Sequence, residues 1–351
     1  MILTCKVWAR GRPVEENQLG LGWHSLPNTK LASVCPSDPT IQGADGCTAV
    51  ISTWGGAAAD TKRNRLIIWG GGHTDYYGNE VYELDVSAQT MSRVTSWTSN
   101  PVLGGTEQQA DGRPTSRHTY DNLAYLPTVD QMFSFGGALA GNPSRGSNAT
   151  WWFDAATFTW TRKDPSKGEH PNGGPGLNVS VYDPNTQLVF VEDLSNLWSY
   201  NPTTNTYARL GGVGNNLDYH LNGVIDSSRK MLFLVGAGQF WAVGIASGSN
   251  HSFQNWSSRV VGCGPLMNSG YPGLAFDTRQ KLVVGWAGGD SVYLFNAETK
   301  SCTTQTFSGG PGPAQQNGTN GRFAYFPALN LFVVVNDWRQ DAYVLRLTPT
   351  P

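Results

Sequence analysis

The sequence predicts an all-β protein built from one repeated unit. The stretch from Leu66 to Asp85 reads LIIWGGGHTDYYGNEVYELD, which is an apolar run, three glycines, a polar loop and a second β-type run. Weaker copies of this pattern follow along the chain, and no stretch longer than about a dozen residues has a convincing helical period. Self-similarity at a period of tens of residues is typical of repeat folds.

Six apolar runs mark the repeats, and each follows a turn such as Asp60–Arg65, as expected for the second strand of a hairpin. The differences between successive start positions are 66, 56, 43, 51 and 49 residues, which is close to the length of a propeller blade. We therefore expect a single β-propeller of six four-stranded blades, with seven as the alternative if residues 1–48 hold further strands. The runs begin at Leu66, Met132, Leu188, Met231, Leu282 and Leu331.

A second signal marks the outer strand of each blade. An aromatic or similar apolar residue follows the turn after the third strand, at Met91, Trp160, Tyr207, Trp256 and Cys302. The sixth unit ends before this position, but Gly22–Leu26 reads GWHSL and resembles the other outer strands. We therefore expect residues 1–48 to be an N-terminal extension that supplies the closing strand of the last blade, and residues 49–351 to form the propeller. Such closure leaves no free sheet edge.

With these repeats, the chain resembles the kelch-type, galactose-oxidase-like β-propellers over roughly residues 20–350. The strings GGGHTDYYGNEVY and SRHTYDNLAYLP are also similar to a set of uncharacterised bacterial kelch-repeat proteins. The resemblance implies the fold strongly and the function weakly, because such propellers include enzymes, lectin-like binders and adaptors.

The composition limits the classes of partner. Glycine is frequent, at 42 of 351 residues, and charged residues make up 14%, well below the usual share of about 25%. The net charge is −2 without a basic run, so we expect no nucleic-acid partner. No apolar stretch is long enough to span a bilayer, so we expect no membrane partner. We expect a monomer whose partner is a polysaccharide or oligosaccharide.

The five cysteines suggest an oxidising compartment. Cys35 and Cys47 bracket a short loop that a disulfide could close, Cys263 and Cys302 flank the fifth blade, and Cys5 is left over. No CxxC pair is present, which argues against a cysteine zinc site. If the disulfides form, an extracellular or periplasmic location follows, although the N-terminus lacks the long apolar core of a signal peptide.

We expect the functional residues where loops meet beside the channel, after each apolar run and before each innermost strand. His73 follows three glycines, and its alternative role is to fix the loop. On a strand, His118 and Tyr120 face one way and Arg117 faces the other, so an imidazole and a phenol would lie side by side. Packing between blades is the alternative for this pair. The catalytic candidates are His73, Arg117, His118, Tyr120, His220 and Arg322.

The same loops supply candidates for substrate binding, in which aromatic rings stack on sugars and amides bind hydroxyl groups. We expect no resident cofactor, with a metal ion held by the rim histidines as the alternative. For Arg339, pairing with a nearby aspartate is the structural alternative. The substrate-binding candidates are Trp54, Asp75, Tyr76, Tyr77, Asn79, Tyr219, Asn222, Asp290, Trp338 and Arg339.

These residues favour a carbohydrate-active enzyme, most specifically a lyase that cleaves an extracellular uronate polysaccharide. Such a lyase needs a cation at the carboxylate, a base and an acid, which Arg117 or Arg322, His118 or His73, and Tyr120 would supply. A glycosidase would need two paired carboxylates, and none is detectable. The alternative is a non-catalytic propeller that binds glycans or proteins. Copper oxidase chemistry would need a cysteine–tyrosine crosslink, for which Cys302 is badly placed.

Overall fold

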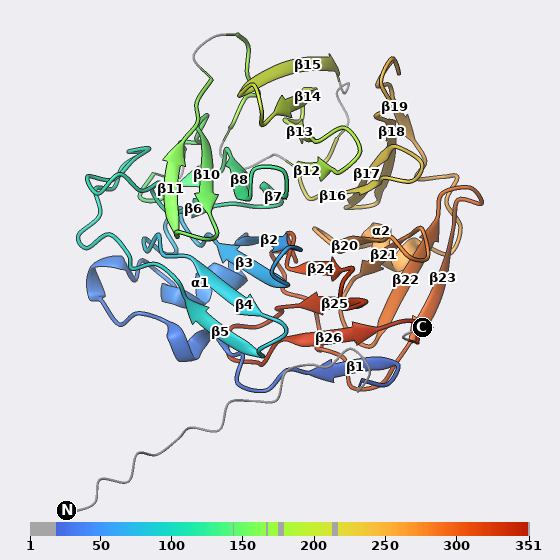
Figure 1. The fold of residues 1–351 in the computed structure, drawn as a ribbon, viewed down its shortest axis with the longest axis horizontal. Coiled ribbons are helices and arrows are strands. Elements are labelled where there is room, and N and C mark those ends of the chain that lie inside the picture. The colour runs from blue at the N-terminus through green and yellow to red at the C-terminus, as the bar shows by residue number, and fades with distance from the viewer. Residues whose placement is uncertain (1–18, 143, 166–167, 175–178, 213–216, 350–351) are drawn as a thin grey trace, which may run out of the picture.

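The structure is a computed structural model that describes residues 19–142, 144–165, 168–174, 179–212 and 217–349. Within these residues, six antiparallel sheets of four strands surround a central axis as the blades of a β-propeller (Figure 1). The expected all-β fold and the count of six blades are confirmed. The helices described are the short α1 (Ala49–Ser52) and α2 (Gly264–Asn268) and the 3₁₀ turns η1 (Leu31–Val34), η2 (Pro39–Ile41) and η3 (Gly46–Thr48).

Each blade runs from an inner strand at the axis to an outer strand at the rim. The inner strands of blades one to six are β2 (Gly56–Asp60), β7 (Leu123–Leu126), β12 (Val179–Asp183), β16 (Asn222–Asp226), β20 (Gly273–Asp277) and β24 (Phe323–Phe326). The second strands are β3 (Arg65–Trp69), β8 (Gln131–Phe135), β13 (Leu188–Glu192), β17 (Met231–Gly236), β21 (Leu282–Trp286) and β25 (Leu331–Val334).

The outer half of each blade contains the third and fourth strands. The third strands are β4 (Tyr82–Asp85), β10 (Thr150–Asp154), β14 (Asn196–Asn201), β18 (Gln239–Gly244), β22 (Ser291–Asn296) and β26 (Tyr343–Arg346). The outer strands are β5 (Thr90–Arg93), β11 (Thr159–Arg162), β15 (Thr206–Gly212), β19 (Phe253–Asn255), β23 (Ser301–Thr306) and, in blade six, β1 (Gly22–Ser25). Two short strands outside the blades, β6 (Arg117–His118) and β9 (Ala138–Leu139), pair with each other.

The apolar runs are continuous because both faces of each blade are buried. Along β3, Leu66 and Ile68 join a core shared with blade six, whereas Ile67 and Trp69 join a core shared with blade two. Similar apolar clusters lie between each of the other neighbouring blades. The second strands therefore lack the alternation of apolar and polar residues expected for a half-exposed sheet.

Buried aspartates fix the hairpins between the inner and second strands. Asp60 is completely buried, and its carboxylate accepts a hydrogen bond of 3.0 Å from the Lys62 amide. Asp183, Asp226 and Asp277 end their inner strands in the same way. Aspartate side chains that bind the backbone two or three residues later are typical of tight turns. The turns predicted before the apolar runs are thus present.

The N-terminal strand closes the ring as expected. Strand β1 pairs with β26 in antiparallel register, with Trp23 opposite Leu345. Trp23 is 7% exposed, its ring lies 6.3 Å from the ring of Trp286, and its indole N–H donates to the Asp290 carbonyl of blade five. The closing strand is therefore anchored to two blades.

Both predicted disulfides are formed. Cys35 bonds to Cys47, and Cys263 bonds to Cys302. The two bonds suggest an oxidising environment, either extracellular or periplasmic. Among the residues that the structure describes, no helix has the length and apolar character needed to cross a bilayer.

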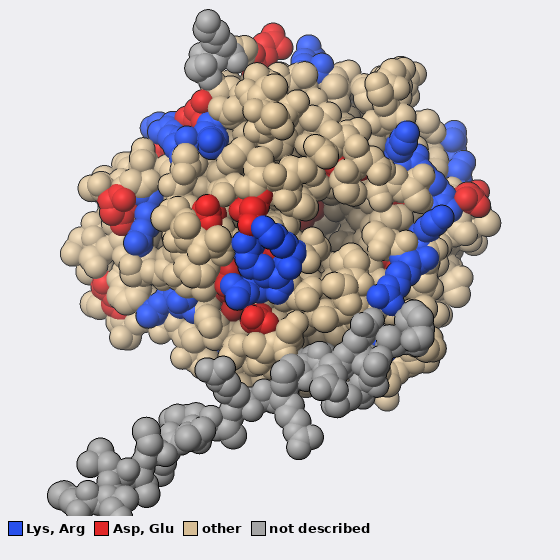
Figure 2. Space-filling model, in the orientation of Figure 1, with Lys and Arg blue, Asp and Glu red and all other residues tan. Residues whose placement is uncertain are grey.

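The centre of the ring encloses a cavity of about 410 Å³ lined by the inner strands of all six blades. It reaches Thr61 and Thr278, in the turns that follow β2 and β20, so it extends to the end of the ring where the inner strands finish. Figure 2 shows a hollow near the centre of the ring. Basic and acidic side chains mix on one side of the hollow, and a row of mostly basic side chains lies on the other side (Figure 2).

Candidate functional site

Side chains from several blades meet where the inner strands begin. The β3–β4 loop of blade one carries His73 and Asp75, and β6 places His118 just before blade two. The His118 ring lies 4.9 Å from the ring of His73, 5.0 Å from Trp54 and 5.9 Å from Tyr120. The two rings lie together, but not by alternation along a strand, since β6 ends at His118 and Tyr120 has a φ of 48°.

The contacts continue from Tyr120 into blades four and five. Its ring lies 6.1 Å from Tyr271, which lies 5.0 Å from His220, which in turn lies 3.7 Å from Tyr219. The rings thus form one unbroken series, from buried Tyr271 to Tyr219, which is 48% exposed. We call this series the aromatic row: His73, His118, Trp54, Tyr120, Tyr271, His220 and Tyr219.

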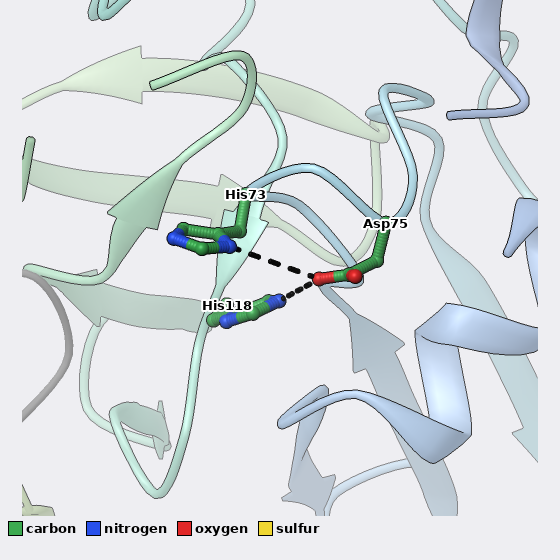
Figure 3. A group of neighbouring side chains, drawn as sticks. All are labelled: His73, Asp75 and His118. Carbon is green, nitrogen blue, oxygen red and sulfur yellow. Dashed lines mark hydrogen bonds and ion pairs between the residues drawn. The ribbon is translucent and has the colours of Figure 1, made fainter. Parts of the chain in front are cut away.

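His118 is a buried imidazole bound to a carboxylate. Its Nε2 lies 2.7 Å from Asp75 Oδ2 (Figure 3). The ring also hydrogen-bonds to the Gly72 backbone. Only 3% of the side chain is exposed, and this burial lowers the pKa of His118. With both sides of the ring engaged and little solvent access, His118 is poorly placed to take a proton from a substrate.

The β3–β4 loop holds Asp75 in a fixed position. A Cβ on Gly72 would lie 2.2 Å from the Arg117 Cα, so only glycine permits this close approach, and His73 has a φ of 63°. The Asp75 carbonyl accepts the Asp45 amide at 3.0 Å. The loop is therefore tied to the segment closed by the first disulfide.

His220 and Asp218 form a second imidazole–carboxylate pair at the other end of the row. His220 Nδ1 lies 2.6 Å from Asp218 Oδ1, and the same oxygen accepts the His220 backbone N–H at 2.9 Å. The His220 side chain is 36% exposed, unlike that of His118. A bond through Nδ1 leaves Nε2 available to a bound molecule.

The residues before the inner strands have unusual backbone conformations. Trp54, Tyr120 and Tyr271 have φ values of 51°, 48° and 50°. Their backbones join adjacent blades, since the Tyr120 amide donates to the Trp54 carbonyl and the Tyr271 amide donates to the His220 carbonyl, both at 2.8 Å. Bulky residues with positive φ are rare, and such strain concentrates at functional sites.

The two arginines expected to neutralise a substrate carboxylate are in the wrong place for it. Arg117 and Arg322 are both completely buried. Arg117 binds Glu107 at 2.8 Å, and Arg322 donates to the backbone carbonyls of Gly55 and Val335. Burial lowers the pKa of Arg322 to about 9. Both guanidinium groups hold loops and blades together, so we correct their expected role.

Three expected binding residues are also buried. Tyr76 is fully buried, and its hydroxyl donates to Glu80. Asn79 binds the Thr98 hydroxyl, and the Asn222 amide donates to the Pro272 carbonyl. None of the three exposes more than 1% of its surface, so a polysaccharide cannot stack on or bind to them directly.

Four further substrate-binding candidates contact residues outside the aromatic row. Tyr77 packs on the core between blades six and one. The Asp290 carboxylate accepts the Gly310 amide, and Arg339 lies 4.6 Å over the ring of Trp338, whose carbonyl binds the η1 turn. Of the sixteen candidates, those in contact at the row are Trp54, His73, Asp75, His118, Tyr120, Tyr219 and His220.

Two residues were missing from the sequence-based candidates. Asp218 precedes His220 by two residues, a spacing that puts a carboxylate beside an imidazole and was visible in the string DYH. Tyr271 lies before β20, as Trp54 lies before β2, so its place in the repeat was the available signal.

Copper–radical chemistry does not fit the residues present. Cys302 lies in outer strand β23 and is bonded to Cys263, so its sulfur is not available for a crosslink to a tyrosine. This agrees with the position expected from the repeat.

Comparison with solved structures supports the propeller fold. A Bacteroides thetaiotaomicron protein of unknown function aligns with a TM-score of 0.53 and 10% identity over 93% of this chain and 76% of its own. YjhT aligns with a TM-score of 0.51 and 13% identity over 89% and 95%. A fungal AA5 alcohol oxidase in complex with copper aligns at 0.47 and 11% identity, over 86% and 65%. These identities show the fold alone.

No protein-family profile matches the chain, and no curated protein sequence matches it.

Proposed function

We propose that the protein is a carbohydrate-active propeller that binds an acidic polysaccharide along the aromatic row and cleaves it by β-elimination at a uronate residue. The observation that carries this proposal is the His220–Asp218 pair, with 2.6 Å between Nδ1 and Oδ1, beside Tyr271 and the exposed Tyr219. A base, an acid and a sugar-binding surface are then adjacent.

The row suits a sugar because it joins apolar ring faces to polar groups. Tyr219 presents an exposed ring, and the ring of His220 lies 3.7 Å behind it. Tyrosine combines a broad contact face with a hydroxyl that can bind a sugar hydroxyl group. Binding residues that lie on loops above a rigid scaffold are a common arrangement.

The proton-transfer roles follow from the environments of the groups. Asp218 holds Nδ1 of His220, so Nε2 is the base. Burial raises the pKa of Tyr120 and of Tyr271 well above the ordinary value, so both phenols keep their protons and serve as acids. These assignments move the base from His118 or His73, the expected candidates, to His220 and retain tyrosine as the acid.

These groups account for every proton and electron pair that moves in the elimination. His220 takes the proton from C5 of the uronate, and the electrons of that C–H bond form the double bond between C4 and C5. The bond from C4 to the glycosidic oxygen breaks, and a tyrosine hydroxyl gives its proton to the leaving oxygen. The imidazolium and the phenolate then return to their resting states by exchange with solvent.

The test is an assay of uronate polysaccharides for the ultraviolet absorbance of the unsaturated product. We expect His220→Gln and Asp218→Asn to lower kcat by about 10²–10⁴-fold, the usual contribution of a general base. Tyr219→Ala should raise KM with little change in kcat, because its exposed ring binds but does not transfer a proton. His24→Gln, at a half-buried histidine in β1 away from the row, is the matched control.

The alternative is a binding module that uses the same row without catalysis. It is favoured by the burial of Arg117 and Arg322, the two arginines expected to neutralise a uronate carboxylate. Glycan binding that survives His220→Gln, with no unsaturated product from any uronate polymer, would establish the binding module and end the lyase proposal.

A further inference from the structure

Three metal-binding side chains converge at the blade-one end of the aromatic row. Within the described residues, His73, Asp75 and His118 form the one group of three His, Cys, Asp or Glu side chains whose donor atoms all lie within 4.8 Å of one another. Figure 3 shows both imidazoles directing a nitrogen at the same carboxylate oxygen. The donors come from a loop of blade one and from strand β6, so the fold brings them together.

The orientation of His118 suits a metal ligand. Its Nε2 points at Asp75 Oδ2 across 2.7 Å, which leaves Nδ1 for the hydrogen bond to the Gly72 backbone. An N–H at Nδ1 that donates to a backbone carbonyl puts the lone pair on Nε2, as in most histidines that bind metals. A lone pair that faces a carboxylate oxygen at this distance is stabilised by a cation between the two atoms, either a proton or a metal ion.

His73 supplies the third donor from a preorganised position. Its Nδ1 lies 3.9 Å from Asp75 Oδ2, and its side chain is 26% exposed, so the group is reached from solvent on this side. Trp54 packs against the other side of His118, with 5.0 Å between the rings. The site therefore combines one buried ligand, His118, with two partly exposed ligands, His73 and Asp75.

We propose that His73, Asp75 and His118 bind one divalent transition-metal ion of the Zn²⁺ type. Two imidazoles and one carboxylate match the borderline ligand preference of such ions, whereas Mg²⁺ and Ca²⁺ prefer oxygen ligands. Three protein ligands leave a coordination position for water or substrate. This proposal develops the alternative to a cofactor-free protein, a metal ion held by the rim histidines.

The ion also supplies a positive charge for binding an acidic polymer, and this part of the inference depends on the proposed function. Arg117 and Arg322 are buried, so neither guanidinium reaches a uronate carboxylate at the row. A bound cation beside Tyr120, at the opposite end of the row from His220, would take the carboxylate of a neighbouring uronate residue at its open position and hold the polymer along the row.

The metal is tested directly, without any activity assay. Protein freed of metal with a chelator is titrated with Zn²⁺ by calorimetry and with Co²⁺ by visible absorption. We expect one ion per chain, and at least about a 100-fold loss of affinity in His73→Gln, a larger loss than removal of a supporting group causes. His24→Gln should retain full affinity. Stoichiometry below 0.2 in the wild type, or equal affinity in His73→Gln, would overturn the site.

A second arm keeps folding and function separate. Asp75→Asn removes the partner of a buried imidazole, so its near-ultraviolet circular dichroism is compared with that of the wild type, and His73→Gln decides the result if Asp75→Asn is unfolded. Adding glucuronate to the Co²⁺ protein should change its spectrum, and adding glucose should not. An unchanged spectrum would show that the bound metal does not take a carboxylate, without contradicting the metal site itself. The lyase assay tests catalysis independently.

Discussion

At the scale of single residues, Asp121 is a buried acid that joins three blades. Its carboxylate accepts the Gly223 amide of blade four at 2.8 Å, and its carbonyl accepts the Ser180 amide of blade three at 2.8 Å. It also lines the central cavity. Burial raises the pKa of Asp121 from 3.8 to about 7, because the charged form loses its hydration.

This shift makes stability depend on pH. The folded protein holds the Asp121 proton more tightly than the unfolded chain, so the stabilisation is complete below about pH 4 and is lost as the pH rises to about 7. Asp121→Asn keeps an acceptor for Gly223 and carries no charge. We expect it to be more stable than the wild type at pH 8, by up to about 4 kcal/mol, and nearly equal at pH 4. Urea unfolding at both pH values measures this.

An equal loss of stability at pH 8 and pH 4 would contradict the prediction, since it would show that hydrogen bonding rather than charge governs this position.

The arginines show where residue-level reasoning from the sequence succeeded and failed. Alternation along the strand correctly put Arg117 on the face opposite His118, yet we had assigned both to the site. Arg117 instead packs against Trp69 and pairs with Glu107 from a distant loop. A guanidinium that enters the core to bind backbone carbonyls has the same local sequence as one that faces a channel. Only the partners distinguish the two cases.

At the scale of elements, the disulfide-closed segment between Cys35 and Cys47 supports the loop that carries the candidate metal ligands. The Ala44 amide donates to the Thr74 carbonyl, and the Gly46 amide donates to the Asp75 carbonyl at 3.2 Å. A Cβ on Gly43 would lie 2.6 Å from the same carbonyl oxygen. The segment and the loop therefore fit closely enough for one to position the other.

We expect the Cys35→Ser/Cys47→Ser variant to lose about 3 kcal/mol of stability, as for a disulfide that closes a loop of this order. It should also lower Zn²⁺ affinity about 10-fold or more, because Asp75 loses its support. Cys263→Ser/Cys302→Ser is the matched control, since that bond lies in blade five. It should lose at least as much stability and keep its Zn²⁺ affinity. Calorimetry measures the Zn²⁺ affinity, and unfolding in guanidinium measures the stability.

If both double variants keep full Zn²⁺ affinity, the segment does not position the site. The sequence predicted both disulfides and most strands, because hairpin turns and outer-strand aromatics depend on local chemistry. It did not predict that residues 41–46 contact the β3–β4 loop, since no local pattern marks a contact between separate loops.

At the scale of the whole molecule, the blade count was predictable because the repeat is regular. Each blade needs apolar residues on both faces to pack against two neighbours, and this demand produces the six runs. The sixth unit lacks its outer-strand position, and the likeness of Gly22–Leu26 to an outer strand also indicated which segment completes it. What no repeat encodes is the identity of the site, because functional residues are by nature those that the repeats do not share.

Ring closure by β1 gives a prediction about cooperativity. Trp23 is 7% exposed, and β1 covers the edge of β26. Trp23→Ala should therefore lower the free energy of unfolding by about 3–5 kcal/mol. It should also raise amide exchange along β26 and promote self-association, because a strand edge without its neighbour pairs with other chains.

Trp160→Ala, in the outer strand of blade two, is the control that loses packing without opening the ring. Hydrogen exchange and light scattering distinguish the two variants: faster exchange confined to blade six in Trp23→Ala alone supports closure by β1, whereas identical exchange in both variants would mean that the ring stays closed without this anchor.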